Sequence, residues 1–201
     1  MNNSKKGDVR MKEIEILVEV YDEPSKIIEK LDNFEFKGVK ETIDVYYYDP
    51  KRDNLKPNKD MQIDECLRIR TKNNEHYITY KVDKFDEAGK WLYSDEYETK
   101  FDDLFMLKNI INKLGFKELL TIHNSKRTYD NGIYEIVLEN VKDLGHFLEV
   151  EYCTNEDVDV KEVKKEIQKF IDSLELNVSE ELNMGKPEIM IRKNNIIIKD
   201  C

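Results

Sequence analysis

Basic side chains recur at alternate positions in two short segments of this chain. Arg68 and Arg70 lie two residues apart in CLRIR, and Lys81 ends YITYK. Residues two apart in a β-strand point to the same face, so these groups can gather on one side of a sheet. Such a row suits a phosphate chain, because the planar guanidinium fork binds two oxygens at once. The whole chain carries a formal net charge of −10, so this local positive charge requires an explanation.

Acidic residues show the same alternation in other segments. The sequence contains the Glu-x-Glu pairs Glu13/Glu15, Glu96/Glu98 and Glu149/Glu151. On a shared face these carboxylates would repel one another unless a cation lies between them. Carboxylates are hard oxygen ligands, which favour Mg²⁺ or Mn²⁺.

Both sets of charges require strands to position them. The segment EIEILVEV is typical, because apolar and acidic side chains alternate along it with a period of two residues. The pattern predicts eight strands, at residues 13–20, 42–50, 66–72, 76–83, 94–100, 119–130, 132–141 and 146–153. Amphipathic helices are predicted at residues 23–34, 102–116 and 155–174. The fold class is therefore α+β, with helices covering the apolar faces of an antiparallel sheet.

The charged faces of these strands are either solvated or turned inward. A solvated face is the ordinary interpretation of any one strand. If the sheet closes, seven acids and four bases line one cavity and leave a charge of −3, which two divalent cations would change to about +1. Each uncompensated buried ion costs several kcal/mol, so this cavity must hold water, metal ions and an anion. The lining residues are Glu13, Glu15, Glu96, Glu98, Glu139, Glu149, Glu151, Arg68, Arg70, Lys81 and Arg127.

Composition limits the other classes. The acidic balance disfavours nucleic-acid binding, because phosphate repulsion must be overcome locally. Three widely spaced cysteines disfavour a zinc site or a disulfide framework and favour a reducing compartment. No apolar segment is long enough for a membrane span, and the N-terminus lacks the apolar region of a signal peptide. We therefore expect a cytoplasmic protein without a membrane partner.

Several motifs resemble the CYTH superfamily, also called triphosphate tunnel metalloenzymes. The resemblance covers about residues 11 to 175 and leans towards the branch of class IV adenylate cyclases. It rests on EIEIL, DECLRIR, ITYK, SDEYE, LGF, SKR and LENVKDLGHFLEVE, which occur in the family's order and spacing.

The resemblance implies a closed eight-stranded antiparallel β-barrel whose interior is a triphosphate tunnel. It implies phosphate binding by Arg68, Arg70, Lys81 and Arg127, and Mg²⁺ or Mn²⁺ binding by Glu13, Glu15, Glu139, Glu149 and Glu151. Glu13, Glu15, Lys81 and Arg127 would be the catalytic residues, and Glu96 and Glu98 would line the tunnel. The implied activity is that of an adenylate cyclase, which converts ATP to cyclic AMP and pyrophosphate, or of a triphosphatase.

The sequence departs from the family at three basic positions, which are Leu17, Ser94 and Ser125 here. Lys126 is predicted to face outward. These departures favour an alternative, a weak or inactive protein that binds a nucleotide or polyphosphate. The expected partner is a small triphosphate such as ATP or inorganic triphosphate. The resemblance is compatible with a homodimer, but the sequence does not decide the oligomeric state. Residues 1–10 are expected to be a flexible N-terminus, and residues 176–201 an extension packed on or near the barrel.

Overall fold

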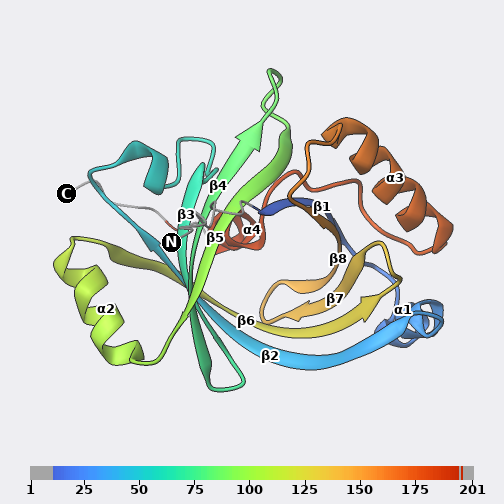
Figure 1. Cartoon of the computed structure of the whole chain (residues 1–201), viewed down its shortest axis with the longest axis horizontal. Coiled ribbons are helices and arrows are strands. Elements are labelled where there is room, and N and C mark those ends of the chain that lie inside the picture. The colour runs from blue at the N-terminus through green and yellow to red at the C-terminus, as the bar shows by residue number, and fades with distance from the viewer. Residues whose placement is uncertain (1–10, 195, 197–201) are drawn as a thin grey trace, which may run out of the picture.

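The computed structural model describes residues 11–194 and residue 196. Eight antiparallel strands close into a barrel in the order β1-β5-β4-β3-β2-β6-β7-β8 (Figure 1). This confirms the predicted α+β barrel. The strands are β1 (Met11–Glu19), β2 (Glu35–Tyr48), β3 (Glu65–Lys72), β4 (Glu75–Phe85), β5 (Trp91–Phe101), β6 (Lys117–Asp130), β7 (Glu135–Val141) and β8 (Gly145–Thr154). The strand predicted from residue 42 begins earlier, at Glu35. The expectation for residues 1–10 lies outside the described residues.

Helices cover the outside of the barrel on two sides (Figure 1). Helices α1 (Pro24–Leu31) and α3 (Val160–Ser173) pack their buried isoleucines and leucine on the outward apolar residues of β1, β7 and β8. Helix α2 (Leu104–Lys113) and the short 3₁₀ helix η1 (Asp53–Leu55) cover β2 and β3 on the other side. Because side chains alternate along each strand and the apolar ones face the helices, many of the polar side chains face the interior of the barrel.

The ends of the longer helices follow from local side-chain chemistry. The carboxylate of Asp159 accepts hydrogen bonds from the backbone N–H groups of Lys161 and Glu162 and caps α3. Asp103 caps α2 in the same way through the N–H of Met106. Gly115 follows α2 with a φ of +100°, a left-handed conformation that terminates helices and suits glycine.

The C-terminal segment closes one end of the barrel. After α3 the chain runs beside β1, where the N–H of Leu182 donates to the carbonyl of Leu17 at 3.0 Å. Helix α4 (Lys186–Asn194) then lies against this end, and its Met190 packs on Leu17 and Tyr46. Phe147 and Ile122 complete this cluster. The interior is therefore apolar at the closed end and charged elsewhere.

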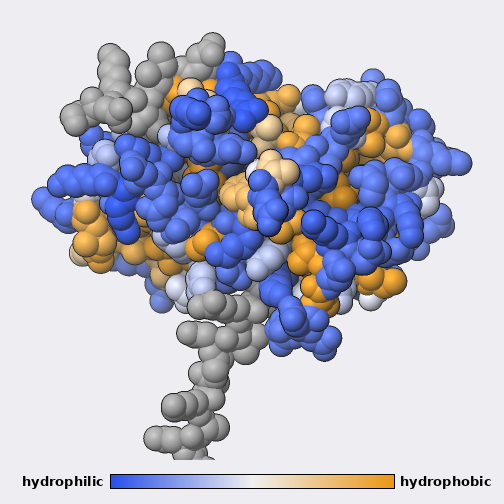
Figure 2. Space-filling model, turned by 90° about the horizontal axis from the view of Figure 1, so that it is seen from above, coloured by the Kyte–Doolittle hydropathy of each residue, from blue (hydrophilic) through white to orange (hydrophobic). Residues whose placement is uncertain are grey.

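The described surface is mainly hydrophilic, with smaller hydrophobic areas on the face shown in Figure 2. Part of α2 is an exception, because Phe105 and Leu114 expose most of their side chains. No helix in the described ranges is long and apolar enough to cross a membrane.

Candidate active site: a charged tunnel

The barrel encloses a cavity of about 310 Å³. All eight strands and residues 183–188 line it. Its charges are sorted, with bases mainly on β2, β3, β4 and β6 and acids mainly on β1, β5, β7 and β8. The cavity opens where Glu98 and Glu135 are exposed, and α4 lines its other end.

Arg68 and Lys81 form the centre of the basic side. Arg68 is buried and donates to the hydroxyl of Thr79 and to Glu96, each at 3.1 Å. Lys81 lies 2.8 Å from Glu13 and 3.3 Å from the second oxygen of Glu96. Glu96 therefore holds two cations close together before any ligand binds. Burial opposes ionisation of Glu96, but Lys81, a hydrogen bond with Glu13 and the charge of Arg68 together outweigh burial and lower the pKa of Glu96 to about 2.

Arg70 is fixed by a residue that sequence reasoning missed. Its Nε and Nη2 donate to the two carboxylate oxygens of Asp44 at 2.8 and 2.7 Å. The side chain of Asp44 is only 1% exposed. Burial alone would raise the pKa of Asp44, but Arg70 holds it well below its ordinary value. The signal in the sequence was a lone acid within the otherwise apolar run TIDVYYY.

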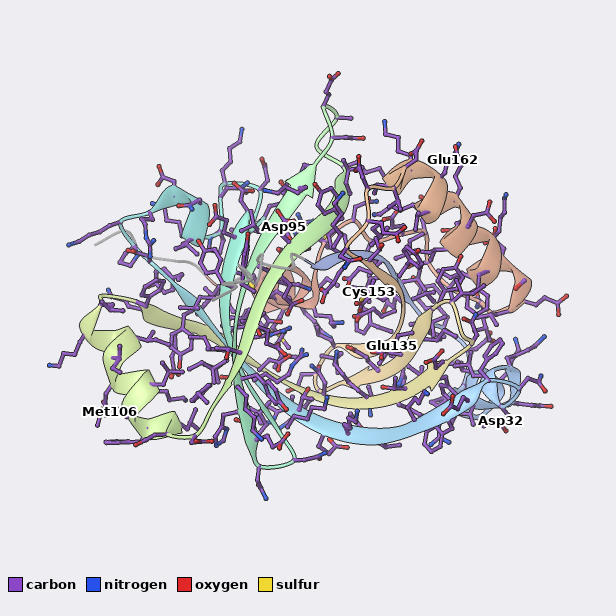
Figure 3. All side chains as sticks on the ribbon, in the orientation of Figure 1. Asp32, Asp95, Met106, Glu135, Cys153 and Glu162 are labelled. Atoms are coloured by element: carbon purple, nitrogen blue, oxygen red, sulfur yellow. The ribbon has the colours of Figure 1, made fainter. Side chains whose placement is uncertain are left out.

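Four glutamates of β1 and β8 form the acidic side. Glu15 lies opposite Glu151 in the strand register, and Leu17 lies opposite Glu149. Carboxylate oxygens of Glu15, Glu149 and Glu151 lie within 4.8 Å of one another, and a second such group joins Glu13, Glu151 and the thiol of Cys153. Figure 3 shows Cys153 beside Glu135 of β7, well away from Met106 on α2.

Three of these glutamates have too little positive charge around them to offset their burial. Burial raises the pKa of Glu13 to about 9, and Lys81 offsets this only in part. Burial and then Glu149 raise the pKa of Glu15 to about 8, and the same two causes raise the pKa of Glu151. Clustered carboxylates that resist ionisation for want of a counter-charge fit a hard divalent cation. The residues present therefore suit a metal ion.

The remaining predicted acids lie in different surroundings. Glu98 is exposed at the open end of the cavity, 3.5 Å from Arg68. Glu139 is fully buried and lies outside both carboxylate groups just described. Two ammonium groups meet it, Lys126 at 2.5 Å and Lys186 at 3.0 Å.

Arg127 requires a correction, because it does not face the tunnel. It stacks on the ring of Phe36, 4.2 Å from its centroid, and its Nε donates to the hydroxyl of Tyr129 at 2.6 Å. Phe36 is 48% exposed, and Tyr129 packs beneath the outer helices. The neighbouring Lys126 lines the tunnel instead.

The error has a physical reason. Ile122 has the same strand parity as Lys126 and looks like a residue of the outer apolar face. It points inward, because the closed end of the barrel is apolar and Ile122 packs there with Met190. Alternation alone therefore interchanges the inward and outward faces of β6. The sequence also gave no signal for Lys186, which comes from the C-terminal segment.

A family model for the CYTH domain matches residues 11–182. The chain belongs to the CYTH domain family. A Methanocaldococcus jannaschii protein named as a candidate adenylate cyclase is 31% identical over 185 residues, which cover 90% of this chain and 99% of that protein.

Two solved structures illustrate the range of similar CYTH folds. A Pyrococcus horikoshii OT3 protein is 30% identical, with a TM-score of 0.74 over 89% of this chain and 99% of that one. A Hippeastrum protein, described as a candidate adenylyl cyclase with dominant triphosphatase activity, is 16% identical. Its TM-score is 0.59, over 94% of this chain and 97% of that one, and it supports the shared fold alone.

The departures from the CYTH motifs have structural explanations. Leu17 is 1% exposed and packs against α4 through Met190. Ser94 is buried and donates its hydroxyl to Asp83 at 2.6 Å. Ser125 alternates with the inward Lys126, so it has outward parity and removes no charge from the tunnel.

Restoring the family lysine at position 17 should therefore harm this protein. We expect Leu17→Lys to lower the free energy of unfolding by at least about 2 kcal/mol, the low end of the cost of losing a buried leucine. It also crowds Glu149, which already binds Lys186. Urea unfolding of both proteins measures the loss. An unchanged or higher free energy of unfolding for Leu17→Lys would contradict this assignment of Leu17.

Glu188 on α4 should make stability depend on pH. It is 5% exposed, and burial followed by repulsion from Asp83 of β4 raises its pKa to about 7, from an ordinary 4.5. The charge of Glu188 also raises the pKa of Cys66 of β3. Backbone N–H groups of Glu188 itself, Ile63 and Gly185 oppose the shift at Glu188. A raised pKa means that the folded protein binds this proton more tightly than the unfolded chain does. Protonation of Glu188 therefore makes its full contribution to the free energy of unfolding below pH 4.5, and this contribution is lost as pH rises through about 7.

The matched variant is Glu188→Gln, which cannot ionise. We expect the melting temperature of the wild-type protein to fall relative to this variant between about pH 4.5 and about pH 7, and the two to run parallel above about pH 8. Glu13 and Glu15 also have raised pKa values, but both proteins contain them and their effect cancels. Parallel melting temperatures between pH 4.5 and pH 7 would show that folding does not raise the pKa of Glu188.

Proposed function

We propose that this CYTH protein is a metal-dependent phosphoryl-transfer enzyme that acts on a triphosphate inside the tunnel. One observation carries the proposal, the meeting of a basic and an acidic side around a single cavity. A basic side alone suits any anion, and an acidic side alone suits any cation. Their opposition suits an anion that binds together with a divalent metal ion, as triphosphates do. The basic residues are Arg68, Arg70, Lys81 and Lys126, and the acidic ones are Glu13, Glu15, Glu149 and Glu151.

The chain itself supplies binding and orientation. Glu96 holds Arg68 and Lys81 side by side, and Asp44 fixes the plane of Arg70. These cations are therefore in place before a phosphate chain arrives, and little reorganisation is needed as charge develops. Phosphoryl transfer depends mainly on such positioning and charge stabilisation.

The metal ion of this proposal is Mg²⁺ or Mn²⁺. Glu151 belongs to both carboxylate groups and would hold the ion together with Glu13 from one group and Glu15 from the other. Glu149 also belongs to the group of Glu15, but it already contacts Lys186. When bound, the ion would supply Lewis-acid stabilisation of the phosphate charge.

Two reactions fit this arrangement. In a cyclase reaction the ribose 3′-hydroxyl of ATP attacks the α-phosphorus, a new P–O bond forms and pyrophosphate leaves. The name of the M. jannaschii relative supports this reaction. In a triphosphatase reaction, water attacks the terminal phosphorus, the bond from that phosphorus to the bridging oxygen breaks, ADP or pyrophosphate leaves, and the attacked phosphoryl group becomes orthophosphate. A protein of the same fold, the Hippeastrum protein, is described as having dominant triphosphatase activity.

Product analysis tests the proposal. The purified protein is incubated with ATP and separately with tripolyphosphate, each with Mg²⁺ or Mn²⁺, and the products are separated by chromatography. Cyclic AMP with pyrophosphate identifies a cyclase, whereas ADP or pyrophosphate with orthophosphate identifies a triphosphatase. If neither substrate gave a product but the protein still bound triphosphate, we would conclude that it is a nucleotide- or polyphosphate-binding protein and not an enzyme.

A further inference from the structure

Glu139 and Glu149 already have their counter-charges. The ammonium of Lys186 bridges them, at 3.0 Å from Glu139 and in direct contact with the Oε2 of Glu149. Lys126 meets the other oxygen of Glu139 at 2.5 Å. Neither oxygen of Glu139 receives a further hydrogen bond within residues 11–194. Two carboxylates and two ammonium groups therefore form a neutral set.

The other carboxylates are not matched in this way. Among the described residues, the one ammonium within ion-pair distance of Glu13, Glu15 or Glu151 is that of Lys81, 2.8 Å from Glu13. Lys186 also acts on Glu15, but its ion pairs are with Glu139 and Glu149. Glu96 contacts Lys81 as well, but it also has Arg68 at 3.1 Å. Three carboxylates against one ammonium leave a formal charge of −2. One divalent cation balances that charge, so a single metal ion neutralises these three carboxylates together with Lys81.

Lys186 reaches this place because of how the C-terminal segment folds. It is the first residue of α4, and its side chain is 12% exposed inside the closed end. Leu17, which lies opposite Glu149 on β1, packs against the same helix. The CYTH family match ends at residue 182, before Lys186. Lys186 thus lies outside the matched segment, and it contacts Glu149, the residue opposite position 17.

We propose that Lys186 is a built-in cation that occupies the place of a second metal ion between Glu139 and Glu149. The tunnel then holds one divalent ion, on Glu13, Glu15 and Glu151. This inference rests on the proposed metal-dependent function for the identity of the ion. It adds the number of ions and the residue that sets that number.

The test counts metal ions. Isothermal titration with Mn²⁺ in the absence of any phosphate should give one Mn²⁺ per wild-type chain. Lys186→Met keeps much of the aliphatic stem but removes the charge, and should bind two. The double variant Leu17→Lys/Lys186→Met supplies an ammonium opposite Glu149 from β1 and should return to one. Lys193→Met, on the exposed face of the same helix, should match the wild-type protein.

A second readout covers the case in which Lys186→Met folds poorly. Without metal its melting temperature should be lower than that of the wild-type protein, and Mn²⁺ should raise it more than it raises the wild-type value, because the ion replaces the lost ammonium. Two Mn²⁺ ions or none on the wild-type chain, or one on Lys186→Met, would overturn the inference. None of these results depends on turnover, so the enzyme proposal can fail or stand separately.

Discussion

Replacing Arg68 with methionine should lower kcat for the triphosphate substrate by about 100- to 1,000-fold, the usual cost of one preorganised donor. Arg68 is 7% exposed and lies between Thr79 and Glu96 at the centre of the basic side. Methionine keeps most of the side-chain volume and removes all five N–H donors. Initial rates on the substrate identified by product analysis provide the measurement.

Arg127→Met is the matched control. Both arginines belong to the family motifs, but Arg127 lies on the outer face against Phe36. We expect this variant to keep kcat within about threefold of the wild-type value, since surface changes away from the site seldom matter. Equal losses in the two variants would contradict the inward placement of Lys126 and the outward placement of Arg127.

Replacing Asp44 with alanine should lower the free energy of unfolding by about 3–5 kcal/mol. Asp44 is 1% exposed and receives both donors of Arg70, whose own side chain is 20% exposed. Its loss leaves a largely buried guanidinium without a partner, and the remaining charges on that side are mainly positive. Urea denaturation measures the change, and its slope shows whether unfolding remains two-state.

The double variant Asp44→Ala/Arg70→Met separates the ion pair from simple packing. Once Arg70 is neutral, loss of Asp44 should cost much less, so the two single effects should not add. Additive losses would mean that Asp44 acts through packing and not through Arg70.

The sequence alone predicted the barrel well because its outer faces are simple. Alternating apolar residues such as Ile14, Ile16 and Val18 pack under α1 and α3, as a period of two residues requires. The same rule places Arg68, Arg70 and Lys81 on the face opposite the apolar residues, and the resemblance to the CYTH superfamily implies that this face turns inward. All three line the cavity.

Alternation failed where the interior itself is apolar. Ile122 faces inward because a segment distant in the sequence covers that end of the barrel. Alternation does place Leu17 inside, but it does not show that this position is part of an apolar cluster. The pattern within one strand does not show which distant segment covers it, so the pattern alone places Arg127 inside and counts Leu17 as a lost base. Lys186 was missed for the same reason, since only the folded path of the C-terminal segment brings it to Glu149.

The most direct test of the central claim is a crystal structure with tripolyphosphate and Mn²⁺, flash-cooled after soaking, with the metal located by anomalous scattering. The account predicts phosphate oxygens within hydrogen-bond distance of Arg68, Arg70, Lys81 and Lys126, and Mn²⁺ on Glu13, Glu15 and Glu151. An anion bound outside the barrel, or bound inside without contact to Arg68 and Lys81, would contradict it.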